Sequence, residues 1–288
     1  MSKRKKILVS LFVIIFLILI VVGANIFVQN QNINSVEISI KYGKSDTIIN
    51  QKEISANLLS NYGDFLKKQR KNIDEEQIEA YLLSNPYIEQ AEVYQTLKGS
   101  LVIKLKQREP IVRIYTLKGL QYYIDKIGKI IPITGMELTD VVVANGNIDV
   151  NAELLNKKQL DTIDIEAKKG FEKTLSKIYY LAQQLSNDTI LNYQIDQIYI
   201  PVKGNYELIP KIGNYIIRIG DTQDVKEELI KLDYLYKEGF SRCGWDNYKV
   251  VDLRFKNQVV CTKKGDDPTI TMPEKTTESS TQEVEENE

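Results

Sequence analysis

The chain of 288 residues carries 38 basic and 39 acidic side chains, two cysteines and no histidine. Without histidine it cannot form a Ser-His-Asp triad, a Cys-His pair or a His-ligated zinc site, and two cysteines are too few for an iron–sulfur centre. A net charge of −1 gives no reason to expect nucleic-acid binding, because proteins that bind phosphate backbones usually carry a basic excess.

The N-terminus predicts a membrane anchor. Consecutive basic residues at positions 3–6 are followed by the apolar stretch Ile7–Val28. No charged side chain occurs between position 6 and Glu37. This stretch reaches the about 20 residues that a transmembrane helix needs. Because the basic residues stand only on its N-terminal side, residues 1–6 are predicted to be cytoplasmic and the rest extracytoplasmic. A cleaved signal peptide, cut near Val22-Gly23-Ala24, is the alternative and exports the same region.

The region that follows predicts elements in the order β-α-α-β-β. Alternating apolar residues indicate a strand at Val36–Ile40, and helical spacing indicates a helix around Ile54–Tyr62. Asp74 is a good N-cap for a second helix, which ends before Pro86 because proline disfavours helical geometry in the residue that precedes it. Two further strands complete this small α+β unit, at Ala91–Gln95 and Leu101–Lys106.

A second folded region predicts an antiparallel sheet backed by two long helices, so that the whole chain has an α+β fold. One helix carries apolar residues at helical spacing through Leu175–Leu185, and another follows Asp224. A closing hairpin pairs Tyr248–Phe255 with Gln258–Thr262 around a turn at Lys256-Asn257. Shorter strands are expected at residues 112–116, 121–125, 129–133, 141–144, 197–200, 206–210 and 215–219.

The C-terminal segment, residues 265–288, is acidic and nearly free of large apolar side chains. Such a composition cannot bury enough surface to offset the entropy of ordering, so the segment is predicted to be a disordered tail. We interpret its charge as that of a solvated segment and not as a binding motif.

Motifs for catalysis are missing from the sequence. It contains no G-x-S-x-G elbow, no Walker loop and no G-x-G-x-x-G run. Two acidic clusters precede predicted helices, where helix capping and the helix dipole explain carboxylates better than a metal or acid–base site does. They are Asp161, Asp164 and Glu166, and Asp221 and Asp224. The chain is therefore predicted not to be an enzyme and to use no metal, no cofactor and no small-molecule substrate.

Cys243 and Cys261 both lie on the exported side of the membrane, where a disulfide is chemically allowed. If the hairpin turns at Lys256-Asn257, Cys261 lies opposite Asp252 and not near Cys243. A bridge would then need the chain before Tyr248 to fold back across the sheet. Two separate thiols are the simpler interpretation, and the sequence leaves the choice open.

The closing hairpin is predicted to form an edge of the sheet. Unpaired N–H and C=O groups on such an edge can accept a strand from another chain. Along Gln258–Thr262, Val259 and Cys261 are expected to point to one face and Val260 to the other. A proline at Val260 is expected to remove one of the donors of this edge. An ordinary edge strand without a partner is the alternative.

Several short runs, in their order and spacing, resemble the FtsQ/DivIB family of bitopic bacterial cell-division proteins. The most specific run is LLSNPYIEQAEV, and the others are LVIKL, REPIV, YIDKIG and YKVVDLRF, which begin at Leu82, Leu101, Arg108, Tyr123 and Tyr248. The resemblance covers roughly residues 1–263. It implies a cytoplasmic start at 1–6, a transmembrane helix at 7–28, a POTRA domain at 33–107, a β domain at 108–264 and a variable tail.

The resemblance implies a non-catalytic scaffold of the divisome, at the division septum in the bacterial inner (cytoplasmic) membrane, that links early and late division proteins. Its partners would be FtsB/DivIC-like and FtsL-like bitopic coiled-coil proteins, which add a strand to the last strand of the β domain. Carried over by position, the partner-binding residues are Trp245, Tyr248, Arg254, Phe255, Gln258, Val259, Val260, Cys261 and Thr262.

Other classes of protein share some of these features. A POTRA-containing envelope biogenesis or secretion factor, acting through protein–protein contacts, is the main alternative. An anchored extracytoplasmic hydrolase is disfavoured by the missing histidines and motifs. A single-pass sensor is disfavoured because residues 1–6 cannot form a cytoplasmic output domain.

Overall fold

The computed structural model describes residues 3–43, 47–133, 140–149, 170–203, 205–221 and 223–265. The chain forms two compact units. Unit 1 comprises Met1–Glu109 with Thr134–Asp140, and unit 2 comprises Pro110–Ile133 with Val141–Glu288. The predicted acidic tail beyond Gly265 and the cluster of Asp161, Asp164 and Glu166 lie outside the described residues.

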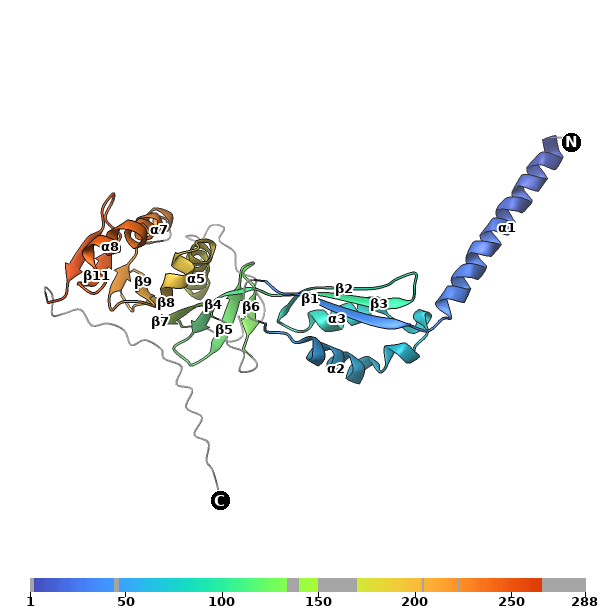
Figure 1. The fold of residues 1–288 in the computed structure, drawn as a ribbon, viewed down its shortest axis with the longest axis horizontal. Helices are drawn as coiled ribbons and strands as arrows, with labels where there is room; N and C mark the ends of the chain where they lie inside the picture. The colour runs from blue at the N-terminus through green and yellow to red at the C-terminus, as the bar shows by residue number, and fades with distance from the viewer. Residues whose placement is uncertain are drawn as a thin grey trace, which may run out of the picture. The chain divides into compact units, whose positions relative to one another are not determined.

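Unit 1 begins with the helix α1, Lys3–Gln29 (Figure 1). Its segment Leu11–Gln29 is long and apolar enough to cross a membrane, and none of it is buried inside the protein. At a rise of about 1.5 Å per residue, its 19 residues reach about 28 Å, close to the thickness of a bilayer core. The structure thus confirms the predicted apolar N-terminal helix.

The rest of unit 1 follows the predicted order β-α-α-β-β. Its three-stranded sheet has the order β1-β3-β2, with β1 parallel and β2 antiparallel to β3. The side chain of Asp74 accepts the N–H of Gln77 and so caps the second helix, as predicted. The elements are β1 Ser35–Lys41, α2 Gln51–Tyr62, the short 3₁₀ turns η1 Phe65–Lys67 and η2 Arg70–Asn72, α3 Glu75–Leu83, β2 Ile88–Gln95 and β3 Ser100–Gln107.

Unit 2 is built on a nine-stranded sheet with the order β12-β11-β10-β9-β8-β7-β4-β5-β6. The strands are β4 Pro110–Tyr115, β5 Gln121–Asp125, β6 Ile130–Pro132, β7 Val142–Gly146, β8 Ile195–Ile200, β9 Glu207–Pro210, β10 Ile216–Arg218, β11 Tyr248–Asp252 and β12 Val260–Lys263.

The expectation of an antiparallel sheet in unit 2 is wrong, because the sheet is mixed. The pairs β4–β7, β7–β8 and β10–β11 are parallel, and the other pairs are antiparallel. Neighbouring parallel strands need a crossover connection, which is usually helical. The two long helices supply such connections, one between β7 and β8 and one between β10 and β11.

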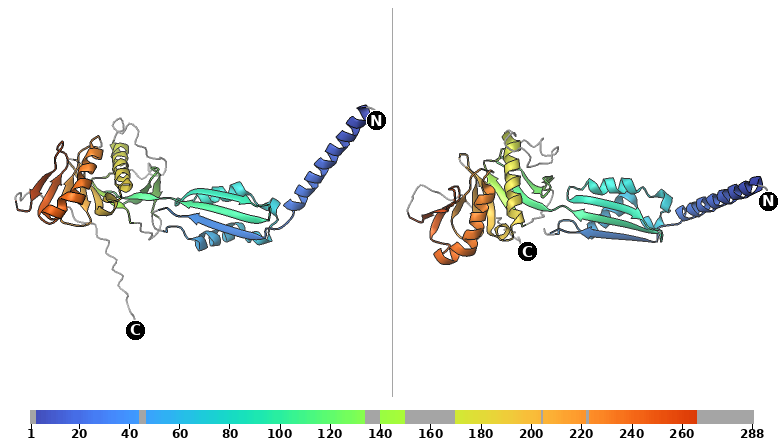
Figure 2. Two further views of the ribbon diagram at one scale, coloured as in Figure 1. Left: turned by 45° about the horizontal axis from the view of Figure 1, so that its top comes forward. Right: turned by 90° about the horizontal axis from the view of Figure 1, so that it is seen from above.

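The helices of unit 2 pack on the sheet through their apolar faces (Figures 1 and 2). Leu175, Ile178, Ala182 and Leu185 are fully buried, as their helical spacing predicts. The helix after Asp224 continues further than expected, through a π-helical turn, to Cys243. The helices are α5 Gly170–Asn187, α6 Leu191–Gln194, α7 Val225–Tyr234, the π-helical turn η4 Leu235–Gly239 and α8 Phe240–Cys243.

Candidate partner-binding edge

The strand β12 lies at one edge of the sheet of unit 2, as the sequence predicts, and pairs with β11 only. The register places Cys261 opposite Val251 and Val260 opposite Asp252. The predicted register, with Cys261 opposite Asp252, is therefore wrong by one residue. The hairpin strands are also shorter than expected, because an irregular connection runs from Leu253 to Val259.

The hydrogen bonds around β11 determine which main-chain groups of β12 face outward. Leu253 donates its N–H to the carbonyl of Arg218 on β10 at 2.9 Å. Because main-chain groups alternate along a strand, Val250 and Asp252 point the other way, toward their partners on β12. Lys264 continues this alternation, since it donates its N–H inward to the carbonyl of Asn247 at 3.1 Å.

It follows that Cys261 and Lys263 direct their N–H and C=O groups to the open edge of the sheet. Val260 and Thr262 direct theirs to β11. The expectation that Val260 offers a donor to a partner is wrong, because its main chain is directed toward Asp252. Sequence alone could not give this result, since a register error of one residue exchanges the inward and outward sets.

The side chains of this edge divide between two faces. Val259 and Cys261 pack against the core of unit 2, together with Trp245 and Tyr248. Val260 points away from this core and is 38 % exposed. This agrees with the alternation expected from the sequence, so an incoming strand would meet an apolar side chain on the outer face.

Trp245 packs between the edge of the sheet and the aromatic side chains of the core. Its ring stacks on Phe240 with centroids 4.7 Å apart, and lies 5.4 Å from the ring of Tyr236. The hydroxyl of Tyr236 is hydrogen-bonded to that of Tyr215 at 3.1 Å. This aromatic cluster was not predicted from the sequence, although Tyr236 and Phe240 continue the apolar spacing of the helix beyond Leu235. Trp245 therefore acts as a core anchor for the chain that enters β11.

Both thiols lie beside Tyr248, and in the described structure both are free. A hydrogen bond with Cys243 raises the pKa of the Tyr248 hydroxyl, and burial adds to the effect. Burial raises the pKa of the Cys261 thiol, and Cys243 reinforces this rise. The residue before Tyr248 is bound to the end of β12, because the carbonyl of Asn247 accepts the N–H of Lys264 at 3.1 Å, and the side chain of Asn247 donates to the carbonyl of Cys243 at 2.6 Å.

Arg254 is engaged by an acidic neighbour. Its Nε and Nη2 contact the two carboxylate oxygens of Asp252 at 2.8 and 2.5 Å. Burial acts to raise the pKa of Asp252, but the hydrogen bonds and charge of Arg254 outweigh it and hold the pKa below its ordinary value. Arg218, opposite Asp252, pairs with Glu207 in turn at 3.2 Å. Charges of alternating sign thus run across the sheet toward the edge.

The connection between β11 and β12 is held by Lys231 of α7. Its ammonium group donates to the carbonyl of Phe255 at 2.8 Å and also to that of Leu253. The side chain of Phe255 is 44 % exposed, and Gln258 is exposed as well. This role of Lys231 could not be predicted from local sequence patterns, because it depends on carbonyl groups more than twenty residues further along the chain.

Glu228 is a buried carboxyl close to this region. It is 3 % exposed, and its Oε2 accepts the N–H of Gly220 at 2.8 Å. Burial raises the pKa of Glu228 above its ordinary value, although the hydrogen bond from Gly220 and the charge of Lys231 act against this rise. The folded protein therefore holds the proton of Glu228 more tightly than the unfolded chain does.

Replacing Glu228 with glutamine is expected to flatten the pH dependence of stability. The raised pKa means that the stabilising contribution of this group is complete below its ordinary pKa and is lost as the pH rises through the folded-state pKa. Glutamine keeps an acceptor for Gly220 and carries no charge. Urea unfolding between about pH 4 and 8 should show the free energy of unfolding falling more steeply for the wild type. Parallel curves would contradict the assignment.

Of the two acidic clusters singled out from the sequence, only Asp221 and Asp224 lie within the described residues. Asp221 binds Lys177 of α5 at 2.6 Å, and Asp224 stands at the N-cap of α7 without a capping hydrogen bond from its side chain. Asp224 therefore lacks the expected capping hydrogen bond, although its place at the N-cap agrees with the expected interaction of its carboxylate with the helix dipole. Among the described residues, no group of three or more Cys, Asp or Glu side chains could hold a metal ion.

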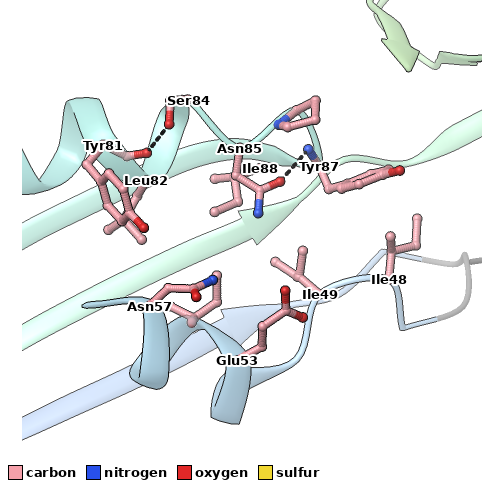
Figure 3. A pocket seen from close by; sticks show the side chains of 12 residues that line it. Ile48, Ile49, Glu53, Asn57, Tyr81, Leu82, Ser84, Asn85, Tyr87 and Ile88 are labelled. Atoms are coloured by element: carbon pink, nitrogen blue, oxygen red, sulfur yellow. Dashed lines mark hydrogen bonds between the residues drawn. The ribbon is translucent and has the colours of Figure 1, made fainter. Parts of the chain in front are cut away.

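A pocket in unit 1 of about 280 Å³ lies between α2 and the segment that joins α3 to β2 (Figure 3). Ile48, Ile49 and Ile88 supply apolar lining, while Glu53 and Asn57 stand on α2 at its side. Glu53 is the one carboxylate of the lining, and no nucleophile is paired with a base there. The pocket offers no arrangement for acid–base or nucleophilic catalysis.

Two family models match consecutive parts of the chain. Residues 31–106, which contain β1 to β2 and most of β3, match the POTRA-like domain. Residues 109–262, more than half of the 288 residues, match the model described as FtsQ/DivIB, C-terminal related. This second match contains β4 and extends into β12 as far as Thr262. No curated protein matches the sequence.

Proposed function

Because the chain belongs to the FtsQ/DivIB family through its match over residues 109–262, we propose that it is a non-catalytic, single-pass scaffold of the bacterial divisome that binds partner proteins by strand addition along β12. The POTRA-like match and the apolar helix α1 fit a membrane-anchored division protein. In this proposal residues 1–6 are cytoplasmic, and both folded units act outside the cytoplasmic membrane at the septum.

The observation that carries the proposal is the open edge at β12. Cys261 and Lys263 present main-chain donors and acceptors in the spacing that an antiparallel strand requires. The edge is four residues long, and lysine at position 263 is its only charged side chain. Little therefore protects it from pairing with another chain.

Side chains on the outer face would select the partner. Val260 offers an apolar contact, and Phe255, in the connection that precedes β12, is a second exposed apolar side chain. Arg254 offers a guanidinium whose charge is shared with Asp252. The partners that fit this proposal are FtsB/DivIC-like and FtsL-like proteins, whose extracytoplasmic segments would place an extended strand against β12.

Trp245 and Tyr248 contribute to the site indirectly. Both pack on the core side of β11, so we assign them to holding the edge in position and not to direct contact with a partner. Gln258 precedes β12, and Thr262 lies between the two outward-facing residues with its own main chain directed to β11. Val259 and Cys261 join the edge to the core through their side chains, while the main chain of Cys261 faces outward.

A fluorescent fusion to the N-terminus of the full chain is expected to form a band at midcell, and depletion of the protein is expected to produce filaments. The reason is that a divisome scaffold acts where the septum forms. The measurement is fluorescence microscopy of growing cells, with cell length scored during depletion. A uniform envelope signal and normal division after depletion would instead support an envelope biogenesis factor.

A further inference from the structure

The end of unit 1 that adjoins α1 brings together segments far apart in the sequence. Just after α1, Ile33 donates its N–H to the carbonyl of Lys68 at 3.0 Å, and Arg70 donates to the carbonyl of Gln31 at 2.9 Å. Asn34 donates to the carbonyl of Gly99 at 2.9 Å. The segment around η1 and η2 and the tip of the β2–β3 hairpin are therefore bound directly to the residues that follow α1 (Figures 1 and 2).

The side chain of Arg70 connects the segment around η2 with the β2–β3 hairpin tip through hydrogen bonds. Its side chain is 6 % exposed and donates from Nη2 to the carbonyl of Thr96 at 2.8 Å and from Nε to Gln95 at 3.1 Å. The amide of Gln95 returns a hydrogen bond to the carbonyl of Arg70 at 3.1 Å. The hairpin tip is thus fixed to the segment around η2, and the side chains beside it have defined positions.

This surface presents exposed leucines among lysines. Leu97 at the hairpin tip is 94 % exposed, and Leu66 in η1 is 48 % exposed. The lysines at positions 67 and 98 directly follow these leucines in the sequence and are exposed, as is Lys71 in η2. Interfacial membrane segments combine the same two kinds of side chain, because apolar groups enter the headgroup region while basic groups attract anionic lipids.

The carboxylates nearby are largely engaged in local hydrogen bonds. Asp64 caps η1 and lies 3.5 Å from Lys67, and Asp74 caps α3. Glu75 accepts the N–H of Gln95 at 3.0 Å. Glu76 is the remaining exposed acid of this stretch. The Lys71 ammonium donates to the side-chain oxygen of Asn30 at 2.7 Å, a neutral partner, so its charge is not cancelled locally. The exposed lysines are therefore the groups of this end that can meet an external negative charge.

The chain connection keeps this surface close to the bilayer. Ile33 follows the end of α1 by four residues, which can span at most about 14 Å. The headgroup layer adds about 5 to 8 Å on each side of a bilayer core. Lysine side chains can extend several ångströms toward it while their stems stay on the protein. The basic surface is thus within reach of lipid headgroups on the side where α1 ends.

We propose that Leu66 and Leu97, with Lys67, Lys71 and Lys98, form a membrane-docking surface that binds the anionic phospholipid headgroups of the bilayer crossed by α1. The leucines enter the interface and the lysines pair with lipid phosphates. This inference rests on the membrane topology of the proposed function, but it is independent of any partner at β12. It gives unit 1 a second attachment to the bilayer besides α1.

Hydrogen exchange of the full chain in lipid nanodiscs tests the proposal. In discs with about a third of phosphatidylglycerol in phosphatidylcholine, amides of residues 64–72 and 95–100 should exchange several-fold more slowly than in pure phosphatidylcholine. Protection should weaken as salt rises, since the screening length falls from about 10 Å at 0.1 M to about 3 Å at 1 M. The triple variant Lys67→Glu, Lys71→Glu, Lys98→Glu should lose the difference between the two lipids.

The chain contains its own matched control. The sequence Thr-Leu-Lys-Gly occurs at 96–99 and again at 116–119, and in both places it forms a hairpin tip with an exposed leucine and a glycine at positive φ. Leu97→Ser with Lys98→Glu should reduce the protection in anionic discs. The same pair of changes at Leu117 and Lys118, which belong to unit 2, should leave it unchanged.

The possible results of this experiment distinguish failure of the docking surface from failure of the membrane topology on which it rests. Failure of the chain to co-elute with nanodiscs would count against α1 as a span, and so against the proposed function. If the chain is incorporated but exchange at 64–72 and 95–100 is the same in both lipids, the docking surface is wrong and the scaffold proposal stands. Protection that appears only when other divisome proteins are added would also overturn it, in favour of a protein contact.

Discussion

Lys263→Pro is expected to weaken binding of an FtsB/DivIC-like partner about tenfold or more while leaving the protein folded. The N–H of Lys263 faces the open edge, so proline removes a donor that only a partner would use. The proline ring also occupies space that an added strand needs. Co-purification of the partner with the tagged full chain, followed by titration with the partner's extracytoplasmic segment, measures the effect.

The neighbouring lysine supplies the control. Lys264 donates its N–H inward to Asn247, so Lys264→Pro should lower the free energy of unfolding by about 1 kcal/mol and retain partner binding. Cys261→Pro, on the outward-facing set, should behave like Lys263→Pro in the binding assay. Equal binding by the variants at 263 and 264 would show that partners do not add a strand here.

Phe240→Ala is expected to lower the free energy of unfolding by about 3 to 5 kcal/mol. Phe240 is 1 % exposed and contacts the rings of Tyr215, Tyr236 and Trp245 at centroid distances of 5.3, 5.5 and 4.7 Å. Its removal leaves a cavity that rigid neighbouring rings cannot fill. Because Trp245 then loses its stacking partner, partner binding at β12 should weaken as well. Urea unfolding in detergent micelles gives the stability change.

Tyr234→Ala is the matched comparison, since this aromatic residue lies on the same helical run but is 68 % exposed. Its effect should stay within about 0.5 kcal/mol. A small effect of Phe240→Ala, similar to that of Tyr234→Ala, would mean that the aromatic cluster does not support the fold of unit 2.

The elements of unit 1 could be predicted because each one carries a local signal. Asp74 and Pro86 mark the two ends of α3, and alternation along Leu101–Lys106 marks β3. In unit 2 the apolar spacing of Leu175–Leu185 predicted α5 equally well. These signals depend only on residues near one another in the sequence, so the tertiary packing of the rest of the chain does not change them.

The direction of strand pairing in unit 2 and the register of the closing hairpin could not be predicted in this way. Pairing direction depends on how each connection crosses the sheet, which no local pattern records. The register depends on the irregularity between Tyr248 and Val250 and on the carbonyls that Lys231 holds. The edge itself was predictable from its position at the end of the folded region, but its outward-facing residues were not.

The shortness of β12 has a consequence for the lifetime of any complex that it forms. Of its four residues, only Cys261 and Lys263 face outward, so a partner strand gains about four main-chain hydrogen bonds. At about 1 kcal/mol each, these bonds correspond to a dissociation constant near 1 mM. Two proteins anchored in one membrane meet at effective concentrations of this order. The edge is therefore suited to partners that are already confined to the same membrane, and to complexes that can be taken apart again.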